Sequence, residues 1–135
     1  MRSQFWGERL YSQDKNVTML SVIETYDKGL FSYGNDSAYP PDRSQAVFPC
    51  ALAVEWSNSS LDDIVAFALR NFADAIRDVA LEDGQNVSHA TKYVNYALFG
   101  TPLEDMYGGN VERLRKIREA IDPNDVMSLT GGWKF

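Results

Sequence analysis

Large and small side chains alternate in the clearest strand of the chain. Between Cys50 and Trp56 the even positions carry bulky residues, and the odd positions carry two alanines and a glutamate. A period of two predicts a strand with one bulky face toward a core and one close-packed face. Pro49 cannot donate a ladder hydrogen bond, so we expect it to mark either the start of this strand or an edge of the sheet.

Two later segments have apolar residues at helical spacing. The first begins at Ser60 with a sequence like a capping box and runs to Gly84, a suitable residue just past a helix end. Its apolar stripe consists of Ile64, Val65, Ala68, Phe72, Ile76 and Val79. The second helix is expected to start after a cap at Asn110 and to end at Asp122, because the residue before Pro123 disfavours helical geometry. Its apolar face consists of Val111, Leu114, Ile117 and Ile121.

The other segments complete an α+β pattern. We predict a short strand over residues 4–11, then a helix capped by Asp14 and stopped by Gly29. The apolar residues of that helix recur every three positions: Val17, Leu20, Ile23 and Tyr26. Residues 31–45 read as a loop, and residues 92–97 as a second aromatic strand or extended segment. The expected fold is α+β, a partial antiparallel sheet flanked by helices.

Composition excludes several classes of function. The chain has 135 residues, of which 44% are hydrophobic and 24% charged, with a net charge of −6. A soluble single domain fits this balance, whereas a nucleic-acid binder needs a basic stripe. No apolar run approaches the roughly 20 residues of a membrane helix. One cysteine and one histidine exclude a zinc finger, an iron–sulfur site and an internal disulfide framework, and we predict no metal site.

The amino terminus carries no apolar segment typical of a secretory signal, so none is expected. The chain nevertheless contains N-x-S/T sequons, which indicate either a secretory ancestry or ordinary polar surface positions. They are at Asn16, Asn35, Asn58 and Asn86.

The residues offer no catalytic constellation by themselves. His89 lies in a polar turn, away from any nucleophile motif, and Cys50 is expected to be a small core residue. Adjacent carboxylates flank predicted helix ends, where acids are ordinary. Gly108 and Gly109 favour a helix start over a phosphate site, and the basic residues that follow indicate a solvated helix face. The glycines at 131 and 132 are expected to reverse the tail and let its two aromatics dock.

Taken in order, several segments of residues 46–135 resemble the C-terminal end of FAD-linked oxidases of the berberine-bridge-enzyme type, within the vanillyl-alcohol-oxidase-like superfamily. They are the strand at 51–57, the Tyr-x-Asn-Tyr block at 92–97, the helix from 107, the Asp-Pro-Asn-Asp segment at 122–125 and the Gly-Gly-Trp-Lys-Phe tail at 131–135. The tail resembles fungal secondary-metabolite oxidases such as the chanoclavine synthases of ergot alkaloid pathways. Residues 1–45 match only loosely.

The resemblance implies that this segment is the remnant of a substrate domain that covers a flavin ring. Asn95 and Tyr93 would then contact FAD, and Tyr96 would contact a small-molecule substrate. An Asn amide can pair with the pyrimidine edge of a flavin through both donor and acceptor, and phenols line apolar pockets with a polar tip. The alternative is that the tyrosines are only sheet aromatics. No catalytic base is assigned.

The expected FAD-binding domain is absent from this sequence, so the resemblance implies a portion that is inactive alone. The family is often secretory. The alternative is a stand-alone, non-catalytic α+β protein that binds a small ligand or dimerises. In either case, an exposed sheet face is expected to promote self-association.

Overall fold

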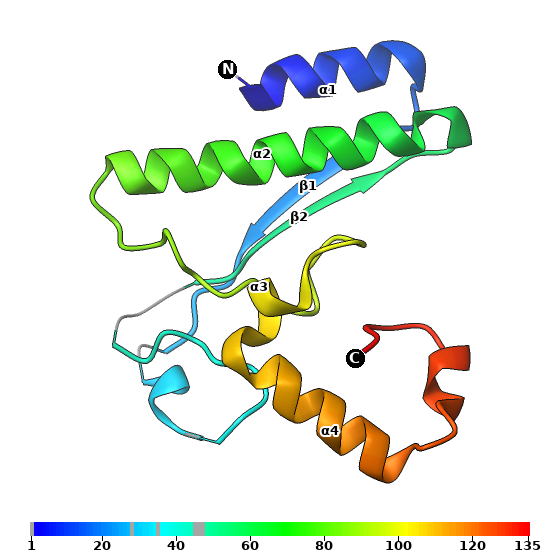
Figure 1. Ribbon diagram of the computed structural model, residues 1–135. Helices are drawn as coiled ribbons and strands as arrows, with labels where there is room; N and C mark the ends of the chain where they lie inside the picture. The colour runs from blue at the N-terminus through cyan, green and yellow to red at the C-terminus, as the bar shows by residue number, and fades with distance from the viewer. Residues whose placement is uncertain (1, 28, 35, 45–47) are drawn as a thin grey trace. The chain divides into compact units, whose positions relative to one another are not determined.

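The computed structural model describes residues 2–27, 29–34, 36–44 and 48–135 (Figure 1). Its helices and strands are α1 (Arg2–Gln13), β1 (Thr18–Ile23), β2 (Cys50–Glu55), α2 (Asp62–Glu82), α3 (Leu103–Tyr107) and α4 (Val111–Ile121). The α+β class predicted from the sequence is confirmed. None of the described helices has the length and apolar character needed to cross a membrane.

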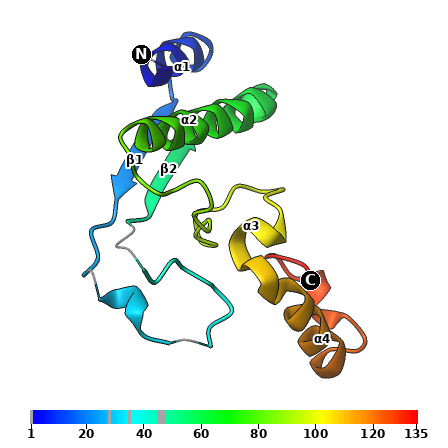
Figure 2. The same ribbon diagram turned by 60° about the vertical axis from the view of Figure 1, so that its left-hand side comes forward.

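The chain forms two compact units, and each is built from two separate stretches of sequence. The first unit comprises Met1–Tyr26 and Phe48–Ala90, and the second comprises Asp27–Val47 and Thr91–Phe135. The first unit contains α1, the two strands and α2. The second contains α3 and α4, which follow each other closely in Figure 2.

Helix α2 organises the first unit by packing on α1 and on β2, and Figure 1 shows it running alongside both. The strands pair antiparallel, with Thr18 opposite Glu55 and Ile23 opposite Cys50. The buried core cluster consists of Leu10, Leu61, Val65 and Ala68. Residues packed around it are Trp6, Val17, Val54, Ile64 and Leu69.

The sequence prediction for the first 26 residues is wrong. Residues 4–11 belong to helix α1, and the predicted helix after Asp14 is strand β1. Trp6 and Leu10 lie four residues apart, which places them on one face of the helix. Leu10 is fully buried, and the Trp6 ring meets the Phe67 ring of α2 edge-on with centroids 5.6 Å apart. The residues of β1 include β-branched Thr18, Val22 and Ile23, which suit a strand once β2 supplies a partner.

Asp14 does not cap a helix but joins the two ends of the hairpin. Its carboxylate accepts hydrogen bonds from the Asn16 amide at 2.9 Å, the Ser57 amide at 2.8 Å, the Ser57 hydroxyl at 2.9 Å and the Asn58 amide at 3.1 Å. These donors favour the charged form, and the Ser57 amide is the largest cause that lowers the pKa of Asp14.

The strand and the long helix predicted from residue 50 onward are confirmed, with local differences. Val54 packs on the core as expected, but Cys50 is exposed, in the pair with Ile23 at the end of the hairpin where the connecting loop joins the two strands. A short 3-10 helix (Ser59–Leu61) precedes α2, and the Asn58 side chain caps it by accepting from the Ser60 amide at 3.1 Å. Helix α2 itself begins after Leu61 without a side-chain cap. Gly84 follows the C-terminus of α2 with φ 84°, as predicted.

Residues 92–97 form a turn and not the predicted strand, because the Tyr96 amide donates to the Tyr93 carbonyl at 3.0 Å instead of to a neighbouring strand. Helix α3 was not foreseen, and its Met106 is fully buried. Helix α4 is confirmed and ends before Pro123. Asn110 precedes it without capping it, since its side chain instead donates to the Ala38 carbonyl at 3.0 Å.

Other predictions from the sequence are confirmed. Of the two tail aromatics expected to dock, Phe135 does so, edge-on against Tyr107 with ring centroids 5.1 Å apart, and Gly132 supports the reversal with φ 104°. Arg113, Arg115 and Lys116 of α4 reach solvent, and the last two lie near the acidic Glu112, whereas Arg118 is only partly exposed. Among the sequons, Asn16 and Asn58 make local polar contacts, while Asn35 lies outside the described residues.

Candidate functional site

The turn at 93–96 brings together the residues that the sequence singled out. The Asn95 side-chain amide donates to the Tyr93 hydroxyl at 3.0 Å. The rings of Tyr93 and Tyr96 meet edge-to-face, with centroids 5.1 Å apart and planes at 86°. Asn95 is exposed, and Tyr96 is 41% exposed. One tight turn therefore presents an amide beside two phenols.

Helix α3 holds this turn in place from one side. The Lys92 backbone amide donates to the Asp105 carbonyl at 2.8 Å, and the Lys92 ammonium pairs with the Asp105 carboxylate at 2.8 Å. Two bonds between the same residues fix the backbone at the start of the turn. The exposed ion pair itself contributes little to stability, so its effect is chiefly one of position.

A tyrosine that sequence reasoning missed completes the cluster. Tyr39, from the loop before β2, contacts the Tyr93 ring edge-on at 5.8 Å and the Phe31 ring at 6.4 Å. The site is thus a row of aromatic rings that runs from Phe31 through Tyr39 and Tyr93 to Tyr96. An aromatic residue directly before Pro40 and Pro41 in a polar loop was the available signal, because such a residue is rarely left without a packing role.

The environment of the Tyr39 phenol favours its neutral form. Burial is the largest cause that raises the pKa of Tyr39, and the nearby Tyr93 raises it further because two phenolates would repel each other. Neutral phenols can donate or accept one hydrogen bond while presenting an apolar ring. The cluster can therefore line a ligand and orient it through a few polar atoms.

Other residues considered from the sequence lie elsewhere. His89 is exposed in a turn and Cys50 is exposed on β2, both in the first unit. Within the described ranges, no group of His, Cys, Asp and Glu side chains is arranged to hold a metal ion. The paired carboxylates at 62–63 and 104–105 lie in the first turns of α2 and α3, as predicted.

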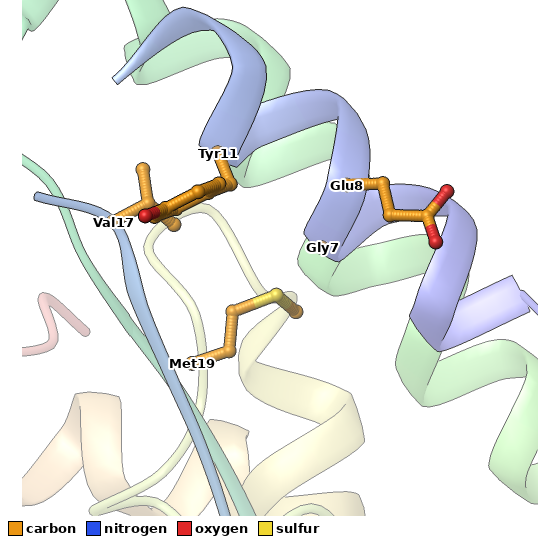
Figure 3. A pocket seen from close by; sticks show the side chains of 5 residues that line it. All are labelled: Gly7, Glu8, Tyr11, Val17 and Met19. Carbon is orange, nitrogen blue, oxygen red and sulfur yellow. The ribbon is translucent and has the colours of Figure 1, made fainter. Parts of the chain in front are cut away.

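Shallow hollows of a different character lie among the described residues of the first unit. One lies between α1 and β1 and is lined by Gly7, Glu8, Tyr11, Val17 and Met19. Figure 3 shows Met19 and Tyr11 at this hollow, while the Glu8 carboxylate points away. The other is lined by residues of both strands and α2: Met19, Leu20, Ser21, Leu52, Ala53, Val54, Leu69 and Phe72. Both linings are mainly apolar and carry no convergent set of charged groups.

Comparison with known proteins supports the family for the C-terminal part of the chain. Residues 92–130 match the model of the family described as "Berberine and berberine like". The chain is also 34% identical over 89 residues to the FAD-dependent monooxygenase tpcD of Cochliobolus heterostrophus, a match that covers 64% of this chain. It spans only 17% of that relative's length. No solved structure matches the chain significantly.

The chain is thus similar to the berberine-like family over residues 92–130 and to one FAD-dependent protein, and the range matched by the family model contains Tyr93, Asn95 and Tyr96. The donor set fits the ring portion of a flavin. The Asn95 amide is bonded to the Tyr93 hydroxyl through its nitrogen, and its oxygen has no hydrogen-bond partner among the described residues. An exposed amide acceptor beside phenol rings suits the donor and acceptor edge of an isoalloxazine.

Proposed function

We propose that this chain is the C-terminal portion of a FAD-linked oxidoreductase that oxidises a small, alkaloid-like secondary metabolite. Within the family, this oxidoreductase would belong to a subgroup like the chanoclavine synthases. The observation that carries the proposal is the convergence of Asn95, Tyr93 and Tyr96 in one turn inside the family-matched segment. When bound, FAD would accept the hydride from the substrate, and O₂ would then reoxidise the reduced flavin.

In this proposal the chain contributes binding and orientation. Asn95 would meet the pyrimidine edge of the flavin through its exposed amide, with Tyr93 holding the amide plane. Tyr96 would line the substrate side with its ring and use its hydroxyl to orient the substrate. Most of the FAD surface, including the pyrophosphate, would be bound by a further domain, because the chain spans 17% of the relative's length. We therefore propose that the chain alone does not hold FAD.

The test is a fusion of residues 1–135 to the FAD-binding domain of a relative, measured by the anaerobic rate of flavin reduction. Asn95→Ala should slow reduction by about ten- to a hundredfold, since an unpaired group in a partly dry site costs roughly 1–3 kcal/mol. Tyr96→Phe should cost less. His89→Ala is the matched control and should change nothing. A slow His89→Ala protein beside a normal Asn95→Ala protein would refute the site.

A second function, non-catalytic self-association or small-ligand binding, is favoured by the hairpin. Leu20 is 58% exposed, Val22 40% and Ile23 66%, so β1 presents an apolar surface. Its residues between Thr18 and Ile23 include no charge that would keep another copy away. Gel-filtration mass with and without added FAD separates the two functions: a dimer indifferent to FAD supports association alone, and flavin absorbance that coelutes with the chain supports the oxidoreductase.

A further inference from the structure

Within the second unit, the loop before β2 is hydrogen-bonded at several points to the later stretch that begins at Thr91. The Thr91 hydroxyl donates to the Pro40 carbonyl at 2.9 Å, and the Asn110 side chain donates to the Ala38 carbonyl at 3.0 Å. Arg113 pairs with Asp36 at 2.6 Å. These bonds come from residues on both sides of α3 and all end on the stretch 36–40. Tyr39 therefore sits in a segment whose backbone is held at its two ends.

The same loop is also braced from within. The Arg43 guanidinium donates to the carbonyls of Phe31, Tyr33 and Gly34. Pro41 is buried, and two successive prolines restrict the backbone after Tyr39. Because the backbone of this loop is already restricted, the Tyr39 ring loses little further freedom when it packs, and it offers the Tyr93 ring a fixed packing surface.

The orientation of the Tyr93 ring depends on this contact with Tyr39. The centroid of the Tyr39 ring lies 5.8 Å from that of the Tyr93 ring. The Tyr93 hydroxyl accepts a hydrogen bond from the Asn95 side-chain amide at 3.0 Å. The ring orientation of Tyr93 sets where its hydroxyl lies, and the hydroxyl sets the plane of the Asn95 amide. Tyr39 thus acts on Asn95 through one intervening side chain.

We infer that Tyr39 is a positioning residue for the candidate site, which fixes Tyr93 and thereby the direction in which Asn95 presents its amide to a ligand. Tyr39 lies outside the family-matched residues 92–130. The inference rests on the proposed function for the nature of the ligand, while the positioning is a property of the chain itself. The ring of Tyr39, and not its hydroxyl, does the positioning, because Tyr39 contacts Tyr93 and Phe31 through ring edges and faces.

The test uses the full chain without flavin and reads the Asn95 side-chain amide by two-dimensional NMR. Tyr39→Ala should shift this signal and raise the hydrogen-exchange rate of its N–H groups by about tenfold, the equivalent of one hydrogen bond's net contribution. Tyr39→Phe keeps the ring and should restore the wild-type signal. Tyr33→Ala is the matched control, since it removes a tyrosine of the same loop that is 80% exposed, and it should leave Asn95 unchanged.

Tyr39→Leu guards against a general loss of structure, because it keeps apolar volume but removes the aromatic edge. The methyl signal of buried Met106 reports whether the second unit is folded in each variant. An unchanged Asn95 signal in folded Tyr39→Ala or Tyr39→Leu protein would overturn the inference. Failure of the proposed function is seen separately: Asn95→Ala would leave flavin reduction unaffected in the fusion, while Tyr39 would still control the Asn95 signal.

Discussion

Replacing Leu10 by alanine tests whether helix α1 belongs to the core of the first unit. Leu10 is fully buried, and it is the residue of α1 in a core cluster that otherwise comes from the segment Leu61 to Ala68. The substitution removes three carbon atoms, worth roughly 0.8 kcal/mol each, or about 2.4 kcal/mol. The cavity left behind raises the expected loss to about 3–5 kcal/mol. Helix propensity does not offset this loss, because leucine and alanine are both good helix formers.

The assay is urea unfolding followed by tryptophan fluorescence, with Trp133 replaced by phenylalanine. The remaining Trp6 and Trp56 both belong to the first unit and report on it alone. Leu81→Ala is the matched control, since the same change is made on a helix of the same unit at a side chain that is 39% exposed. We expect it to cost under about 1 kcal/mol. Equal losses in the two variants would refute the packing of α1 on the core.

Two predictions concern pH. The pKa of Asp14 is lowered in the folded state, so its contribution to the free energy of unfolding is present above its ordinary pKa of 3.8. This contribution is lost as the pH falls through the lower, folded-state pKa. Below about pH 4 the urea midpoint should therefore fall more steeply with pH in the wild type than in Asp14→Asn. The pKa of Tyr39 is raised, so its contribution is present below the ordinary value of 10.0 and is lost as the pH rises through the higher, folded-state pKa. Tyr39→Phe should flatten the alkaline limb of the urea midpoint, and an unchanged limb would contradict the burial of this phenol.

The elements that the sequence predicted correctly are those with local signals. Helix α2 has a long apolar stripe and Gly84 after its last turn, and the Gln85 amide donates to the Ala80 carbonyl at 2.9 Å to close that end. Helix α4 is ended by Pro123. In each case neighbouring residues decide the conformation, so a short window of sequence contains the information.

The errors arose where distant residues decide. The segment from Val17 to Ile23 has apolar residues at spacings that suit a helix, yet it pairs with β2, whose first residue is Cys50. The turn at Tyr93 has strand-like aromatics, but α3 and the Tyr39 loop supply its partners. The residue types of the candidate site were therefore readable from the resemblance, whereas Tyr39, which supports them, was visible only in three dimensions.

The interleaving of the two units has a consequence for synthesis on the ribosome. Leu10 cannot reach its partners Leu61 and Val65 until α2 has emerged, so the amino-terminal helix must wait through the synthesis of the whole Tyr39 loop. That loop in turn waits for Thr91, Asn110 and Arg113. Each unit is closed by its later stretch, and the nascent chain exposes apolar surface for most of its translation.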